Sequence, residues 1–101
     1  MVSGEKDERF TSGTAVLDFG SRSCRPCKVM EPFLESVLSE YPDIKLVKID
    51  VEEEPGVASK FEIRGIPHLV FLQSGEEKGR LSGGHGSKRL KEFVEECLSK
   101  P

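Results

Sequence analysis

One stretch of this sequence decides the fold, Ala15-Val16-Leu17-Asp18-Phe19-Gly20-Ser21-Arg22-Ser23-Cys24-Arg25-Pro26-Cys27. Residues 15–19 form a nearly continuous apolar run, which predicts a strand buried on both faces with the carboxyl of Asp18 in its middle. From Cys24 to Tyr41, apolar residues recur four apart with apolar neighbours, which predicts an amphipathic helix. Pro32 lies inside that helix and should bend it, because a proline removes one internal hydrogen bond.

The other elements are predicted outward from this stretch. Residues 44–51 predict a second strand, and a strand–helix–strand order favours parallel pairing with a right-handed crossover. Before Ala15 there is room only for a short strand or turn. The remaining elements are a short helix over 53–61, a strand over 69–72, a hairpin turn over 73–76, an edge strand over 78–81, and a helix capped by Ser87 with the apolar face Leu90, Phe93, Val94, Cys97 and Leu98.

This order predicts an α/β fold, a central mixed β-sheet of four to five strands flanked by helices on both faces. The chain has 101 residues, which is enough for a single domain over 1–101 with one hydrophobic core. We expect it to act as a monomer.

Composition and charge exclude several classes of protein. Residues are 36% hydrophobic and 33% charged with a net charge of -3, and the basic residues are interspersed with acidic ones, which argues against a nucleic-acid partner. Residues 1–9 contain no apolar core of a signal peptide, and no later run approaches the length of a membrane span. We therefore expect a cytoplasmic protein with no membrane partner.

The pair Cys24-x-x-Cys27 carries the chemistry. Three cysteines are an odd number, and in a reducing cytosol a close pair indicates redox chemistry or a metal site. Cys24 lies where the predicted helix begins, so unpaired backbone N–H groups and the helix dipole stabilise its thiolate. A zinc site needs two further ligands, and the candidates His68, His85 and Cys97 are scattered, so redox chemistry is favoured and no metal is expected.

Four motifs in this order resemble the thioredoxin family over about 85 residues, from Ala15 to the end of the chain. They are Val16-Leu17-Asp18-Phe19, Cys24-Arg25-Pro26-Cys27-Lys28, Gly65-Ile66-Pro67, and Gly83-Gly84 before Ser87-Lys88. The resemblance implies the thioredoxin fold and a thiol–disulfide oxidoreductase that reduces protein disulfides. It also implies an external electron donor of the thioredoxin-reductase type and no bound cofactor, because the Cys24–Cys27 pair itself is redox-active.

The resemblance also implies roles for individual residues. Cys24 would be the nucleophile and Cys27 the resolving thiol, while Asp18 would be a buried carboxylate that takes up the proton of Cys27. Burial raises the pKa of a carboxyl toward neutrality, which agrees with that role. Lys48 matches the lysine that partners this aspartate.

A substrate groove is implied beside the dithiol. Pro67 matches the family's cis-proline, and Ile66 before it would offer its backbone to an extended substrate segment. The predicted groove residues are Arg25, Pro26, Gly65, Ile66, Pro67 and Gly84.

The sequence departs from the family around Cys24. Gly20 and Ser23 occupy positions where thioredoxins usually carry tryptophan, and the chain has none. Arg22, Arg25 and Lys28 make this rim cationic, which favours the Cys24 thiolate and makes the disulfide a better oxidant, unless these charges are merely solvated.

Three further residues are assigned on local pattern. His68 follows Pro67 and is interpreted as a hydrogen-bonded histidine at a strand start rather than a proton donor. Cys97 is interpreted as a buried small apolar residue. His85 receives no role.

Two alternatives to a general reductase stay open at this point. One is a thioredoxin-fold binding or adaptor module that recognises a partner without catalysis. The other is a dedicated redox carrier or isomerase.

Overall fold

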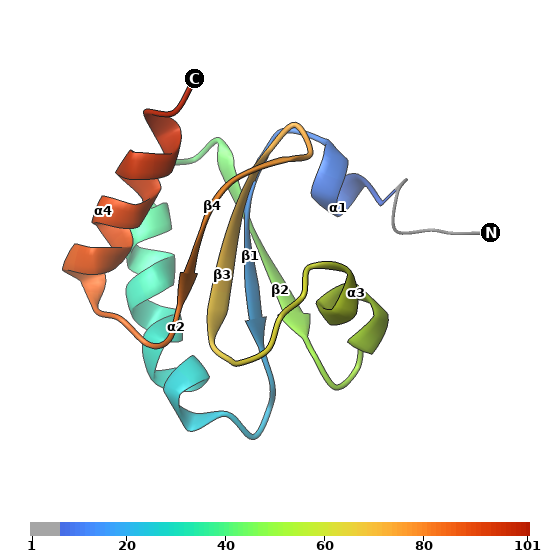
Figure 1. Ribbon diagram of the computed structural model, residues 1–101. Helices are drawn as coiled ribbons and strands as arrows, with labels where there is room; N and C mark the ends of the chain where they lie inside the picture. Colours follow the sequence, from blue (N-terminus) through green and yellow to red (C-terminus); the bar gives the residue numbers. More distant parts are fainter. Residues whose placement is uncertain (1–6) are drawn as a thin grey trace.

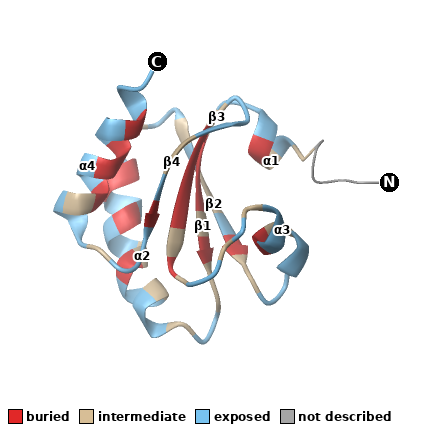
Figure 2. Cartoon of the chain, viewed as in Figure 1, coloured by how far each residue is buried: buried red, intermediate tan, exposed pale blue. Residues whose placement is uncertain are grey.

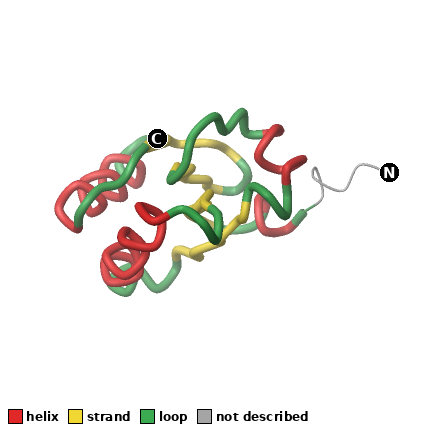
Figure 3. The backbone as a smooth tube through the Cα atoms, turned by 90° about the horizontal axis from the view of Figure 1, so that it is seen from below, coloured by secondary structure: helices red, strands yellow, loops and turns green. Residues whose placement is uncertain are grey.

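A four-stranded mixed sheet lies between two layers of helices in the computed structural model, which describes residues 7–101 (Figure 1, Figure 3). The strands are β1 (Thr14–Gly20), β2 (Ile44–Asp50), β3 (His68–Gln73) and β4 (Glu76–Ser82). The helices are α1 (Glu8–Thr11), α2 (Arg25–Leu38), α3 (Pro55–Lys60) and α4 (Ser87–Leu98). Helices α2 and α4 cover one face, and α1 and α3 cover the other, which confirms the predicted fold class.

β1 is central in the sheet, whose strand order is β2-β1-β3-β4. It pairs in parallel with β2, as predicted for a strand–helix–strand unit, and antiparallel with β3. Side chains alternate along the strand, so Leu17 and Phe19 face α1 and α3, whereas Val16 packs under α2 and α4. Asp18, two residues after Val16, therefore points toward α2, the helix that carries the cysteines.

α2 buries a narrower stripe than its sequence pattern predicts. The helix continues past Pro32, and its buried side chains are Met30, Leu34, Val37 and Leu38. Val29 and Phe33 lie one helical turn apart on a flank that stays uncovered, where they are 58% and 43% exposed. Figure 2 shows α2 as a mixture of buried and exposed segments. No helix within residues 7–101 is long and apolar enough to cross a membrane.

Several element ends differ from the prediction. β2 ends at Asp50, and β3 and β4 extend beyond their predicted ranges at both ends. The prediction that Ser87 caps α4 is wrong, because Gly86 with its extended backbone occupies the cap position and Ser87 is already helical. Leu98 lies in the last turn of α4 and is 42% exposed.

The segment before β1 forms the short helix α1, not the predicted strand or turn. Its cap is Asp7, whose carboxylate accepts a hydrogen bond from the N–H of Arg9 at 3.0 Å. Phe10 is buried and packs edge-to-face on Phe61, with ring centroids 5.4 Å apart. The prediction of no signal-peptide core in residues 1–9 falls mainly on residues 1–6, which lie outside the described residues.

Gly79 of β4 lies directly against Cys97 of α4. The thiol of Cys97 is buried, as predicted, and burial raises its pKa. A Cβ atom at position 79 would lie 2.8 Å from Cys97 Sγ, closer than two such atoms can pack.

Gly79→Ala is therefore expected to lower the free energy of unfolding by about 1–3 kcal/mol, the usual cost of overpacking. Urea denaturation measures the loss. The same substitution in a Cys97→Ala background should cost less, because the sulfur is gone. Equal losses in both backgrounds would contradict the contact.

Candidate active site

The two cysteines lie at the start of α2, where the backbone turns from extended to helical. Cys24 is the cap residue of the helix, and its Sγ accepts a hydrogen bond from the N–H of Cys27 at 3.2 Å. One helical turn separates the residues, their Cα atoms are 5.3 Å apart, and their sulfurs form a disulfide. In the reduced form the same N–H and the positive end of the helix dipole stabilise a thiolate on Cys24.

The predicted groove residues come from two loops and the first turn of α2. The Ile66–Pro67 peptide bond is cis, as the family resemblance implies. The N–H of Gly83 donates to the carbonyl of Pro67 at 2.8 Å, which joins the loop before β3 to the loop after β4. A Cβ atom added at Gly84 would lie 4.0 Å from Pro26 Cβ, at van der Waals distance. Gly65 and Ile66 line a pocket of about 410 Å³ at the loop before β3. Arg25 is exposed in the first turn of α2.

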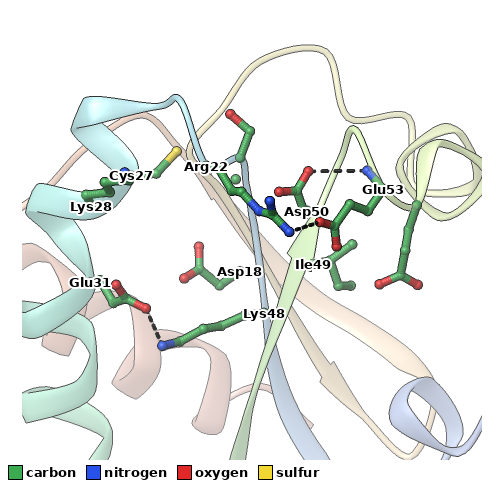
Figure 4. A pocket seen from close by; sticks show the side chains of 12 residues that line it. Asp18, Arg22, Cys27, Lys28, Glu31, Lys48, Ile49, Asp50 and Glu53 are labelled. Atoms are coloured by element: carbon green, nitrogen blue, oxygen red, sulfur yellow. Dashed lines mark hydrogen bonds and ion pairs between the residues drawn. The ribbon is translucent and has the colours of Figure 1, made fainter.

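A second pocket, of about 290 Å³, lies between α2 and the sheet (Figure 4). Asp18 and Cys27 both line it, together with Glu31 and Lys48. Asp18 is half-buried on β1, and this burial, assisted by the nearby carboxylate of Glu31, raises its pKa to about 6 against the opposing effect of Lys48. The pocket thus places a carboxyl that titrates near neutral pH on the same side of the molecule as Cys27.

Lys48 lies opposite Asp18 in the register of β1 and β2, but its ammonium does not pair with that carboxylate. It forms ion pairs with Glu31 and with Glu35, the latter at 2.8 Å. These hydrogen bonds hold the pKa of Lys48 above its usual value. Lys48 thus lies in the place that the family resemblance implies for the partner of Asp18, but its ammonium is held by two carboxylates one helical turn apart on α2.

Residues 6–96 match the sequence model of the thioredoxin family. The chain belongs to the thioredoxin family. It is 34% identical over 93 residues to thioredoxin from Staphylococcus saprophyticus, which covers 91% of this chain and 89% of that protein. It is 32% identical over 99 residues to thioredoxin from Staphylococcus epidermidis, covering 97% and 95% of the two chains.

Solved thioredoxins share the fold as well as the sequence pattern. Oxidized mitochondrial thioredoxin 3 from Saccharomyces cerevisiae superposes with a TM-score of 0.81 at 30% identity, over 90% of this chain and 86% of that one. A mutant thioredoxin from Halobacterium salinarum gives a TM-score of 0.82 at 32% identity, over 96% and 86%. The family, together with the Cys24–Cys27 disulfide, makes this chain a thiol–disulfide oxidoreductase.

Gly20, where thioredoxins usually carry tryptophan, lies directly beside Cys27. A Cβ atom there would lie 3.1 Å from Cys27 Sγ, so even a methyl group would press on the sulfur. The sequence marked Gly20 only as a departure from the family, and its contact with Cys27 emerges only when β1 and α2 are placed together. Of the predicted cationic rim, Arg22 is paired with Glu53 at 2.7 Å.

The two histidines have different surroundings. His85 Nε2 is 2.9 Å from the carbonyl oxygen of Ser82, with which it shares a hydrogen bond. His68 Nε2 is buried without a partner among the described residues, so the interpretation of a hydrogen-bonded histidine fails for this atom, and burial lowers the pKa of the ring. Within residues 7–101, no three His, Cys, Asp or Glu side chains are grouped as metal ligands.

Glu31→Gln is expected to lower the pKa of Asp18 to a value between its ordinary 3.8 and about 6. The substitution removes a like charge beside Asp18 and frees the Lys48 ammonium to turn toward it. Carbon-detected NMR titration of the Asp18 carboxyl measures the midpoint. Glu40→Gln, which removes a carboxylate paired with the distant Lys91, is the matched control. An unchanged Asp18 midpoint in Glu31→Gln would contradict the assignment.

Proposed function

We propose that this chain reduces disulfide bonds in other proteins, with Cys24 as the attacking thiolate and Cys27 as the resolving thiol. The observation that carries the assignment is the asymmetry of the pair. Cys24 Sγ lies at the helix N-terminus and accepts the N–H of Cys27, whereas Cys27 faces Gly20 and the Asp18 pocket. An attacking thiol needs the stabilised thiolate, and a resolving thiol needs a proton acceptor.

The exchange proceeds in two balanced steps. The Cys24 thiolate attacks one sulfur of the substrate disulfide, forms a mixed disulfide with it, and releases the other substrate sulfur as a thiolate that takes up a proton. Cys27 then loses its proton and attacks Cys24 Sγ, so the Cys24–Cys27 disulfide forms as the mixed disulfide breaks. The second substrate sulfur leaves as a thiolate that takes up a proton. Two electrons pass from the dithiol to the substrate.

Asp18 is proposed to accept the proton that Cys27 loses in the second step. The two side chains line the same pocket, and a carboxyl with a pKa of about 6 is largely ionised at pH 7 yet basic enough to take up a proton. Lys48 would act through its charge, since its ammonium is held by Glu31 and Glu35.

The return of electrons is proposed to come from an external reductase of the thioredoxin-reductase type. The dithiol itself carries the two electrons, so no bound cofactor is required. A reducing compartment would keep the pair in its active dithiol form, and we therefore propose the cytoplasm as the place of action, with the chain acting as a monomer.

Reduction of insulin disulfides in the presence of dithiothreitol tests this function. The chain should accelerate insulin precipitation well above the rate with dithiothreitol alone. The Cys27→Ser variant should accumulate a mixed disulfide between Cys24 and insulin, and the Cys24→Ser/Cys27→Ser double variant should not. A chain that binds insulin without accelerating its reduction would instead be an adaptor module.

A further inference from the structure

Beside the dithiol, α2 carries an apolar surface that the packing of this chain does not explain. Val29 and Phe33 are the large apolar side chains most exposed on it, at 58% and 43%. They line a groove of about 390 Å³, here called the α2 groove, whose other walls include Pro26, Gly84 and His85. The groove includes Arg25 and Pro26, the two residues that follow Cys24, so it adjoins the site of disulfide exchange.

The N-terminal end of α2 also carries positive charge, which does not stabilise the helix. Arg25 and Lys28 lie in its first turn, where the helix dipole disfavours cations, and no carboxylate pairs with either among residues 7–101. Arg22 beside them is already paired with Glu53. The whole chain has a net charge of -3, so this local excess of cations runs against the overall balance.

Apolar and cationic side chains therefore meet in one place. Arg25 lines the α2 groove, and a second hollow, whose lining includes Arg25, Lys28 and Val29, adjoins it. None of the described residues that line either hollow carries a carboxylate. Such a surface is complementary to a chain segment with one apolar side chain and neighbouring acidic ones.

We infer that the α2 groove binds the segment of a substrate protein that flanks its disulfide, and that this segment is acidic with an apolar anchor. The inference rests on the proposed reductase function and adds the substrate class to it. The apolar anchor packs on Val29 and Phe33 while the substrate sulfur reaches Cys24. The acidic residues lie against Arg25 and Lys28, which raises the rate of productive encounter.

Two synthetic peptide disulfides test the charge half of the inference. Each contains one apolar anchor and one tryptophan as a fluorescent reporter, and the flanking residues are aspartate in one and lysine in the other. At low salt the aspartate peptide should be reduced at least about tenfold faster, and the ratio should approach one in high salt. Arg25→Glu/Lys28→Glu should reverse the preference, whereas Lys45→Glu, at the opposite end of the sheet, should preserve it.

The apolar half is tested with Phe33→Ser and Leu98→Ser, two side chains of nearly equal exposure, 43% and 42%. Each peptide rate is divided by the same variant's rate with 2-hydroxyethyl disulfide, a small neutral substrate that does not fill the groove. Phe33→Ser should lower this ratio several-fold for the aspartate peptide, and Leu98→Ser should leave it unchanged.

The outcomes separate the two proposals. The chain could reduce 2-hydroxyethyl disulfide and both peptides at equal rates that change neither with salt nor with Phe33→Ser. That result would overturn the binding role of the α2 groove and leave the reductase function intact. Failure to reduce any of the three disulfides would overturn both.

Discussion

Cys24→Ser is expected to lower the rate of insulin reduction by at least about 10³-fold, to the level of dithiothreitol alone. A serine hydroxyl is not ionised near neutral pH and cannot form a disulfide, so the mixed-disulfide step is lost. The helix dipole and the N–H of Cys27 would still surround position 24, but they would have no thiolate to stabilise.

Cys97→Ser is the matched control for this loss. It also removes one cysteine, but from the buried interface of α4 with the sheet, where the residue is 2% exposed. Its activity should stay within a small factor of the unaltered chain, although its stability falls because a hydroxyl replaces a buried apolar group. Retained activity in Cys24→Ser combined with a loss in Cys97→Ser would refute the assignment of the nucleophile.

Asp18→Asn is expected to stabilise the oxidised chain at pH 7 and to leave its stability at pH 3 nearly unchanged. The pKa of Asp18 is raised from 3.8 to about 6 in the folded state, so folding disfavours the ionised carboxyl. The cost is absent below about pH 4, where the carboxyl is protonated in both states. This cost in the free energy of folding grows between pH 4 and pH 6 and reaches its full value above pH 6. The difference between the folded and unfolded pKa values of Asp18 then corresponds to at most about 3 kcal/mol.

Urea denaturation of the oxidised chain at several pH values measures this effect without interference from thiol titration. The two curves of stability against pH should coincide at low pH, diverge between about pH 4 and pH 6, and stay a constant distance apart above that range. Asp43→Asn, at an exposed position just before β2, should show no such divergence. If the stability curves of Asp18→Asn and of the unaltered chain ran parallel over the whole pH range, the raised pKa of Asp18 would be contradicted.

The same substitution should slow the resolving step. Removing the proposed proton acceptor from Cys27 is expected to lower the rate of mixed-disulfide resolution by about 10²-fold at pH 7. Stopped-flow release of a fluorescent thiol from a preformed Cys24 mixed disulfide measures that step alone. A rate equal to that of the unaltered chain would show that water or buffer accepts the proton instead.

Much of the fold and the dithiol could be predicted because the decisive signals are local in sequence. The apolar run of β1, the amphipathic pattern of α2 and the Cys24–Cys27 spacing each lie within one or two elements. Their order is enough to predict the parallel pairing of β1 with β2, since strand–helix–strand units pair in parallel.

The features that could not be predicted arise between elements. Which flank of α2 faces the sheet is set by packing against β1 and α4, so Val29 and Phe33 look like core residues until the helix is placed. The competition of Glu31 and Glu35 for Lys48 depends on how close α2 lies to β2. The spacing of four between the two glutamates was the one signal in the sequence that pointed to it.

The pairing of β1 with β2 has a consequence for folding fidelity. Asp18 and Lys48 are partners in the parallel register, flanked by the pairs Leu17–Val47 and Phe19–Ile49. A slip of one residue would put Val47 or Ile49 beside the carboxyl and turn Lys48 to the other face of the sheet. A chain misaligned in this way could still form the Cys24–Cys27 disulfide. It would lose the nearby charge of Lys48, which lowers the pKa of Asp18. The titration of Asp18 would therefore distinguish correctly aligned molecules from misaligned ones that a thiol count scores as intact.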